Sequence, residues 1–199
     1  MKSNKEMVEY LISIGALKTQ RIIEAFLNIN RLDFVKPEYA KDAYENYPLP
    51  IGYGQTISQP YTVAFMLELL QPKSSDDILD VGCGSGWTTA LLAYIADKGS
   101  VMGVEIVEQL VEFGKNNLKK YNFKNAKIVH GDKLLSKDQH FDRILVSAAA
   151  KEMPNELIDA MKKNARMVIP VNSSIFLVEK KDNELFFDEH YGFSFVRLM

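Results

Sequence analysis

The sequence predicts an α/β protein with a doubly wound, mostly parallel sheet, an N-terminal helical cap and antiparallel edge strands. An apolar run over 77–81 leads directly into three glycines and a helical pattern, which is typical of a buried parallel strand, a tight turn and a helix. Short apolar runs and helical patterns then alternate along the chain. The length of 199 residues fits one domain over 1–199. We expect the cap and a functional loop over 1–60 and the α/β core over 61–199.

The first 60 residues predict two short helices and then a long loop. Residues 5–28 carry two amphipathic patterns separated by Gly15, and Thr19 stands at the N-cap of the second. Residues 47–61 combine prolines, glycines and polar side chains, which argues against regular structure. A loop of this length in a compact domain is usually functional. We expect it to lie across the mouth of a ligand site, at the carboxyl ends of the strands.

The glycine turn indicates a cradle for a nucleotide or nucleoside. Glycine permits positive φ and close approach of a ligand, and the helix that follows points free N–H groups at it. The spacing from Asp80 through Gly82, Gly84 and Gly86 is D-x-G-x-G-x-G. It differs from the dinucleotide fingerprint, whose third glycine would fall at Trp87, and no Gly-Lys-Ser/Thr closes a P-loop.

A carboxylate supports the same interpretation. The next apolar run ends at Glu105, where an acidic side chain can accept hydrogen bonds from both ribose hydroxyls. An ordinary strand–helix–strand crossover with a surface glutamate is the alternative. The combination of strand, glycines and acid favours the ligand.

The rest of the chain continues the α/β pattern. An aspartate after the third strand, Asp132, is a candidate partner for an adenine amino group or a turn residue. Small residues at 147–150 would leave room for a ligand above the sheet. The expected elements are helix 107–121, strands 126–130 and 141–146, a helix from Pro154 to about 163, strand 166–171, and edge strands 174–180 and 193–198 joined by a polar turn at 182–183.

Composition narrows the class of protein. The formal net charge is −2 and basic residues are scattered, which disfavours a nucleic-acid partner. No apolar run approaches the roughly 20 residues of a membrane span. The single cysteine, Cys83, fits a reducing cytoplasm, and the three histidines lack metal-ligand spacing. We expect a cytoplasmic monomer with no metal and no membrane partner.

With these motifs in place, the chain resembles the protein-L-isoaspartate O-methyltransferase family over nearly its whole length. The most specific match is P-L-P-I-G-x-G-Q-T-I-S-Q-P-Y at 48–61, whereas the glycine motif alone resembles class I S-adenosylmethionine-dependent methyltransferases in general. Further matches are Arg31-x-x-Phe34-Val35, Gly131-Asp132, 141–144 with 147–149, 168–171, and Phe195-Val196.

The resemblance implies a cofactor, a reaction and a set of site residues. The cofactor would be S-adenosylmethionine, and the methyl group would go to the α-carboxyl of L-isoaspartyl residues in damaged proteins, whose ester promotes succinimide formation and repair. Ser58 would be the active-site residue and hold the acceptor carboxylate. Its alternative role is to cap the following helix together with Gln59, ahead of Pro60. Residues that would bind the cofactor are Thr56, Ile57, Gln59, Asp80, Gly82, Cys83, Gly84, Gly86, Glu105, Ile106, Asp132 and Lys133.

The chain departs from the family pattern at four places. Lys133 and Asn164-Ala165 stand where glycines are usual, a Gln is missing after Val171, and Arg197 replaces the usual Pro. These departures concern acceptor recognition more than cofactor binding. Two other hypotheses therefore remain at this point: a class I methyltransferase for another carboxylate or small molecule, and a non-catalytic module that binds S-adenosylmethionine or damaged proteins. Cofactor consumption would separate the module from the enzymes, and a panel of acceptors would separate the enzymes.

Overall fold

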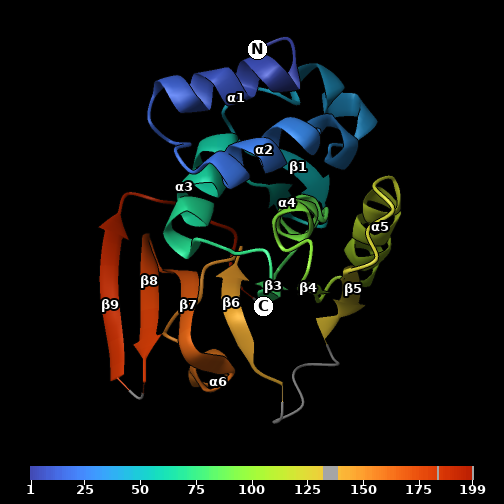
Figure 1. The fold of residues 1–199 in the computed structure, drawn as a ribbon. Helices are drawn as coiled ribbons and strands as arrows, with labels where there is room; N and C mark the ends of the chain where they lie inside the picture. Colours follow the sequence, from blue (N-terminus) through green and yellow to red (C-terminus); the bar gives the residue numbers. More distant parts are fainter. Residues whose placement is uncertain (132–138, 183, 199) are drawn as a thin grey trace.

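A computed structural model of the chain describes residues 1–131, 139–182 and 184–198. Within these residues, one sheet contains seven strands in the order β5-β4-β3-β6-β7-β8-β9 (Figure 1). The five strands β5, β4, β3, β6 and β7 pair in parallel, whereas β8 pairs antiparallel with both of its neighbours, β7 and β9. The predicted fold class is confirmed. The strands are β3 (Asp77–Val81), β4 (Ser100–Glu105), β5 (Ala126–His130), β6 (Phe141–Val146), β7 (Met161–Val171), β8 (Ser174–Lys181) and β9 (Glu184–Tyr191).

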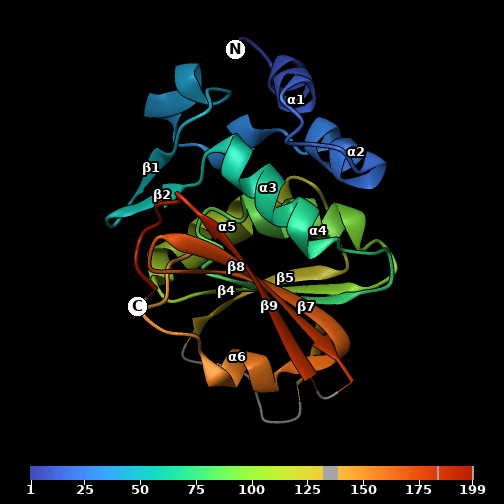
Figure 2. The same cartoon turned by 90° about the vertical axis from the view of Figure 1, so that its left-hand side faces the viewer.

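Helices cover the two faces of this sheet unequally. Figure 2 shows α3, α4 and α5 over one face and α6 on the other, with α1 and α2 stacked above α3 and α4. Their bounds are α1 Asn4–Ser13, α2 Gln20–Asn28, α3 Pro60–Leu70, α4 Trp87–Ile95, α5 Glu108–Lys119 and α6 Asn155–Asp159, with 3₁₀ turns η1 Arg31–Phe34 and η2 Pro37–Asp42. None of the helices in the described part of the chain has the length and apolar character needed to cross a membrane.

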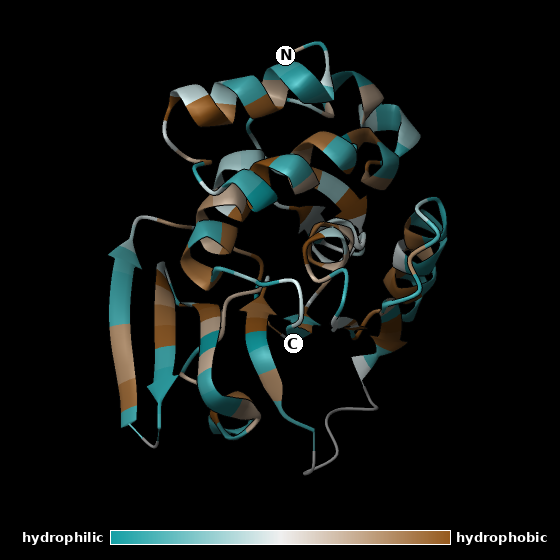
Figure 3. Ribbon diagram, viewed as in Figure 1, coloured by the Kyte–Doolittle hydropathy of each residue, from teal (hydrophilic) through white to brown (hydrophobic). Residues whose placement is uncertain are grey.

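The N-terminal helices and the sheet share one hydrophobic core. Buried side chains such as Met7, Phe26, Leu67, Leu91 and Ile128 belong to the same packed cluster. In Figure 3, hydrophobic colour covers the upper part of β8, whereas the arrowheads of β8 and β9 are hydrophilic. The cap is therefore packed onto the sheet by apolar contacts, which fixes its position relative to the strand ends.

The expectation of an irregular loop over 47–61 is wrong. This segment forms a hairpin of β1 (Leu49–Gly52) and β2 (Gln55–Ile57), paired antiparallel. Tyr53 and Gly54 have φ values of +55° and +72° at its turn, and positive φ at both central positions suits the twist of a tight hairpin. Pro50 in β1 occupies an exposed position between two buried side chains, where a missing N–H is tolerated.

Two expectations for the C-terminal third are also wrong. The helix after Pro154 ends at Asp159, and residues 161–165 extend β7 instead. The second edge strand is β9 rather than 193–198, because the turn at Asp182 (φ +54°) sends the chain straight back along β8. Residues 193–198 run across the molecule to Ala149, whose N–H donates to the Val196 carbonyl at 2.8 Å.

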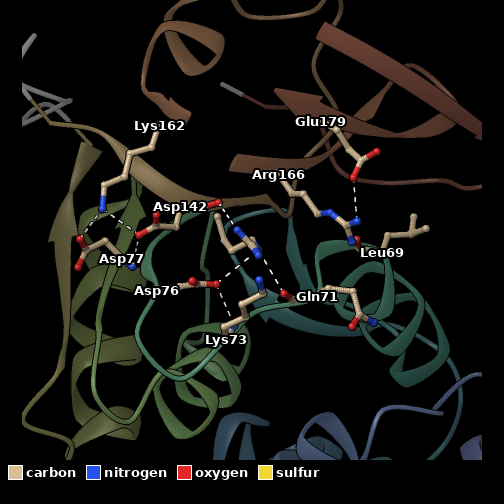
Figure 4. A network of polar contacts seen from close by, with 10 residues as sticks. Leu69, Gln71, Lys73, Asp76, Asp77, Asp142, Lys162, Arg166 and Glu179 are labelled. Atoms are coloured by element: carbon tan, nitrogen blue, oxygen red, sulfur yellow. Dashed lines mark hydrogen bonds and ion pairs between the residues drawn. The ribbon is translucent and has the colours of Figure 1, made fainter. Parts of the chain in front are cut away.

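A polar network ties the amino ends of the central strands to the end of α3 (Figure 4). The Lys162 ammonium lies 2.7 Å from Asp77 Oδ2 and 2.8 Å from Asp142 Oδ2. Arg143 Nε donates to the Gln71 carbonyl at 3.2 Å, and Arg166 Nη2 pairs with Glu179 Oε1 at 2.7 Å. This network lies at the opposite ends of the strands from the glycine turn and links β3, β6, β7 and β8 with the end of α3.

Candidate active site

A cavity of about 260 Å³ opens at the carboxyl ends of β3, β4 and β6. Its walls come from the β1–β2 hairpin, the glycine turn, the first residues of α6 and the C-terminal segment. The structure thus brings together loops that are far apart in sequence, at the place where open α/β sheets bind ligands. Residues predicted for the site that do line it are Thr56, Ile57, Ser58, Gly82, Cys83, Gly84, Glu105 and Ile106.

The glycine turn adopts a backbone that other residues rarely take. Gly82, Gly84 and Gly86 have φ values of +72°, +50° and +83°. A Cβ on Gly84 would lie 3.0 Å from Ile51 Cδ1, and one on Gly86 would lie 3.2 Å from the Gly114 carbonyl oxygen. Conformation therefore favours glycine at all three positions, and the Gly114 backbone also limits space at Gly86; the N-terminus of α4 follows directly. This arrangement fits a nucleoside-containing cofactor bound against the turn.

Glu105 braces that turn from the end of β4. Its Oε2 accepts the Gly84 N–H at 2.9 Å and its Oε1 accepts the Val107 N–H at 2.9 Å. The side chain is only 6% exposed, yet it lines the cavity. Each carboxylate oxygen has further acceptor capacity beyond one backbone donor. The carboxylate is thus oriented by the protein and can receive two hydroxyl groups of a ligand.

Asp80 lies behind the turn rather than in the cavity wall. Its Oδ2 accepts hydroxyl hydrogen bonds from Thr88 at 2.7 Å and Thr89 at 2.6 Å. Within the described chain its buried Oδ1 has no hydrogen-bond partner. Burial raises the pKa of Asp80 to about 6, and the charge of Glu105 adds to this, while the two threonine bonds oppose it.

Of the other predicted residues, Gln59 and Gly86 do not line the cavity, and Asp132 and Lys133 lie outside the described residues.

Ser58 lines the cavity in the short segment between β2 and α3. The alternative that it caps α3 is contradicted, because the N-cap position belongs to Gln59 and no side-chain capping bond from it occurs among the described residues. The Asn46 Oδ1 instead accepts the Tyr61 N–H at 2.9 Å. Asn46 therefore performs the capping from another segment, which leaves the Ser58 side chain available to the cavity.

Several lining residues were not predicted from the sequence. Trp87 and Thr88 begin α4 immediately after the turn, and this position next to Gly86 was a usable signal. Val196 and Arg197, which the family resemblance connects with acceptor recognition, also line the cavity, as do Leu157 in the middle of α6 and Leu198. Leu157 and Leu198 carry no comparable sequence signal, since only the tertiary path of the chain brings them to the site. Groups of His, Cys, Asp or Glu that could hold a metal ion are not found among the described residues.

Comparisons with known proteins agree with this geometry. The family model described as protein-L-isoaspartate(D-aspartate) O-methyltransferase matches residues 2–199. A protein-L-isoaspartate O-methyltransferase of Methanopyrus kandleri is 39% identical over 207 residues, covering 100% of this chain and 92% of the relative. One from Pyrococcus horikoshii is 38% identical, covering 98% of this chain and 92% of the relative.

A solved structure is also similar over the full length. A Plasmodium falciparum chain described as belonging to the same group of methyltransferases superposes with a TM-score of 0.88 at 27% identity. The match covers 100% of this chain and 99% of that one. That structure was solved in complex with S-adenosyl-L-homocysteine.

Proposed function

The chain belongs to the protein-L-isoaspartate(D-aspartate) O-methyltransferase family, and on that premise we propose how its residues carry out the reaction. The enzyme transfers a methyl group from S-adenosylmethionine to the α-carboxyl of L-isoaspartyl residues in damaged proteins. The observation that carries the assignment of roles is the single cavity shared by Ser58, the glycine turn and Glu105.

The residues of the turn fit the cofactor. When bound, S-adenosylmethionine supplies an electrophilic methyl group on its sulfonium. Gly82 and Gly84 would admit it close to the backbone, and Glu105 would accept the hydrogen bonds of its ribose hydroxyls. Ile57 and Ile106 contribute apolar surface to the cavity wall. Exclusion of water there strengthens the polar contacts and protects the methyl group from hydrolysis.

On the acceptor side, the chain needs to orient a group that is already reactive. A carboxylate is ionised at pH 7 and is itself the nucleophile, so no proton has to be removed from it. We assign the Ser58 hydroxyl to donate a hydrogen bond to the acceptor carboxylate, holding one oxygen while the other faces the methyl group. Alignment of the reacting atoms then contributes to the rate enhancement.

The acceptor assignment is tested with paired peptides that differ only in Asp versus isoAsp. The protein is incubated with each peptide and methyl-labelled S-adenosylmethionine. Base-labile label should appear on the isoAsp peptide alone, since the site must read the shifted main chain beside the carboxylate. Equal labelling of both peptides would indicate a different carboxyl methyltransferase, and tight cofactor binding without labelling would indicate a non-catalytic module.

We also propose that the enzyme is a cytoplasmic monomer that binds neither nucleic acid nor membranes. The single cysteine and the net charge of −2 support this proposal. Size-exclusion chromatography with light scattering should give the mass of one chain, 22.6 kDa. A mass of twice that value would contradict the monomer.

A further inference from the structure

Arg31 is a fully buried cation whose guanidinium donates hydrogen bonds to main-chain carbonyls of two other segments. Nη1 donates to the Ala43 carbonyl at 2.6 Å and to that of Glu45 at 3.4 Å. Nη2 donates to the Tyr47 carbonyl at 3.2 Å and to the Ser58 carbonyl at 3.0 Å. One side chain in η1 therefore fixes the segment before the hairpin and the residue that faces the acceptor.

The same guanidinium also contacts the cofactor side of the site. Its carbon lies 5.3 Å from the centre of the Trp87 ring, a cation–π distance. Trp87 is the first residue of α4, follows Gly86 directly and lines the cavity. Phe26 packs edge-on against the same indole at 5.6 Å between ring centres. Arg31 thus links the Ser58 segment to the helix that begins at the glycine turn.

Burying the charged guanidinium of Arg31 costs desolvation free energy. Its presence therefore indicates a function that an apolar side chain could not perform. In the described part of the chain no carboxylate forms an ion pair with it. Burial lowers the pKa of Arg31 to about 9, and the nearby Tyr47 opposes this effect. Even buried ion pairs are often replaceable by apolar groups of similar volume without loss of stability, so burial of the Arg31 charge is not by itself evidence of a stabilising role. A planar fork that reaches several carbonyls at once is a geometric property of arginine alone.

Ser58 depends on this fork because its own segment is irregular. It lies after β2 ends at Ile57 and before α3 begins at Pro60. Two hydrogen bonds hold this segment: Arg31 donates to the Ser58 carbonyl, and Asn46 accepts the Tyr61 N–H. The Arg31 bond is the one made to Ser58 itself. Losing it would free the residue to shift relative to the turn.

We propose that Arg31 is a positioning residue that sets the place of Ser58 relative to the cofactor turn. This inference rests on the proposed role of Ser58 in holding the acceptor. Lysine would keep the charge but offers a compact ammonium that neither spans the carbonyls nor stacks on Trp87. A displacement of about 1 Å in an aligned site lowers turnover by roughly 100-fold.

The test is a double-mutant cycle of Arg31→Lys and Ser58→Ala, with Leu11→Ala as the control for stability. Leu11 is fully buried in α1 and does not line the cavity, so its variant loosens the cap without touching Ser58. All variants are assayed at a temperature where circular dichroism shows them folded. We measure kcat and KM for an isoAsp peptide, and Kd for S-adenosylmethionine by calorimetry.

We expect Arg31→Lys to lower kcat by about 10- to 100-fold, with Kd for the cofactor changed by less than about threefold. In the Ser58→Ala background the same substitution should change kcat by less than about threefold, because it acts through that side chain. Leu11→Ala should keep kcat within about twofold of the parent. An added guanidinium salt at millimolar concentration should partly restore turnover in Arg31→Gly.

Other outcomes reject the inference. If Ser58→Ala lowers kcat but folded Arg31→Lys does not, Arg31 has no positioning role and the proposed function stands. If Ser58→Ala itself has no effect, the role of Ser58 fails first. Additive losses in the cycle, equal losses in Leu11→Ala, or failure of both arginine variants to fold would make Arg31 a structural residue only.

Discussion

At the residue scale, Asp80 shows how the fold changes a single carboxyl group. The side chain is completely buried, and its hydrogen-bond partners in the described chain are two threonine hydroxyls rather than a cation. Desolvation disfavours the charged form, so burial raises the pKa of Asp80 to about 6. An unfolded chain would release the same proton near pH 4.

This difference predicts a pH dependence of stability. Between about pH 4 and pH 6 the folded state binds more protons than the unfolded state, so the free energy of unfolding falls as the pH rises through this window. The full loss is about 3 kcal/mol, because the two pKa values differ by about two pH units. Asp80→Asn keeps the shape of the side chain but cannot titrate. Urea denaturation at pH 4, 5, 6 and 7 should show the parent losing stability relative to this variant, and parallel curves would contradict the prediction.

At the element scale, α3 illustrates a helix whose N-terminus is satisfied from outside its own sequence. Pro60 occupies the first helical position, as expected, but the residue before it makes no capping bond through its side chain in the described structure. The amide of Asn46 takes this role by accepting the Tyr61 N–H at 2.9 Å. The cap thus couples the start of α3 to the segment held by Arg31.

Loss of this cap should be visible in stability. Asn46→Ala removes the acceptor and leaves the Tyr61 N–H part-buried without it, so we expect about 1 kcal/mol less free energy of unfolding. Gln59→Ala is the matched control at the N-cap position itself and should change stability by less than about 0.5 kcal/mol. Chemical denaturation of the two variants shows whether Asn46 or Gln59 caps α3. A larger loss in the Gln59 variant would return the capping role to the local sequence.

At the scale of the whole molecule, residues from distant parts of the chain together form the cavity and the hydrophobic core. The walls of the cavity come from residues between 51 and 198, and one apolar cluster joins the N-terminal helices to the sheet. A ligand that binds only the folded state should therefore stabilise the entire chain in one transition. Saturation at 100 times Kd adds about 2.7 kcal/mol, which corresponds to roughly 5–10 °C in Tm for a protein of this size.

Thermal melts with and without S-adenosylhomocysteine test this expectation, and Glu105→Gln provides the control. The carboxamide nitrogen cannot accept the backbone N–H that it would face at Gly84 or Val107, and it also weakens the ribose contact. The rise in Tm should therefore be much smaller in the variant at the same ligand concentration. An equal rise would remove Glu105 from the cofactor site, and two separate transitions would contradict a single cooperative unit.

The sequence by itself determined the central elements and the cofactor turn. Strands β5 and β6 begin and end where the apolar runs do, and the glycines fall at the positive-φ positions between β3 and α4. These features are local, since a buried parallel strand needs a continuous apolar run and a tight turn needs glycine. Glu105, predicted from the sequence to bind the ligand, lines the cavity, because it ends the strand next to that turn.

Only the tertiary structure decided the edges of the sheet and the acceptor side of the site. Strand β9 is exposed on both faces, so its sequence shows no alternation, and pairing with β8 alone defines it. The passage of 196–198 over Ala149 depends in the same way on contacts between distant segments. The position of Ser58 itself is set by Arg31, 27 residues earlier, a hydrogen bond that no local pattern encodes.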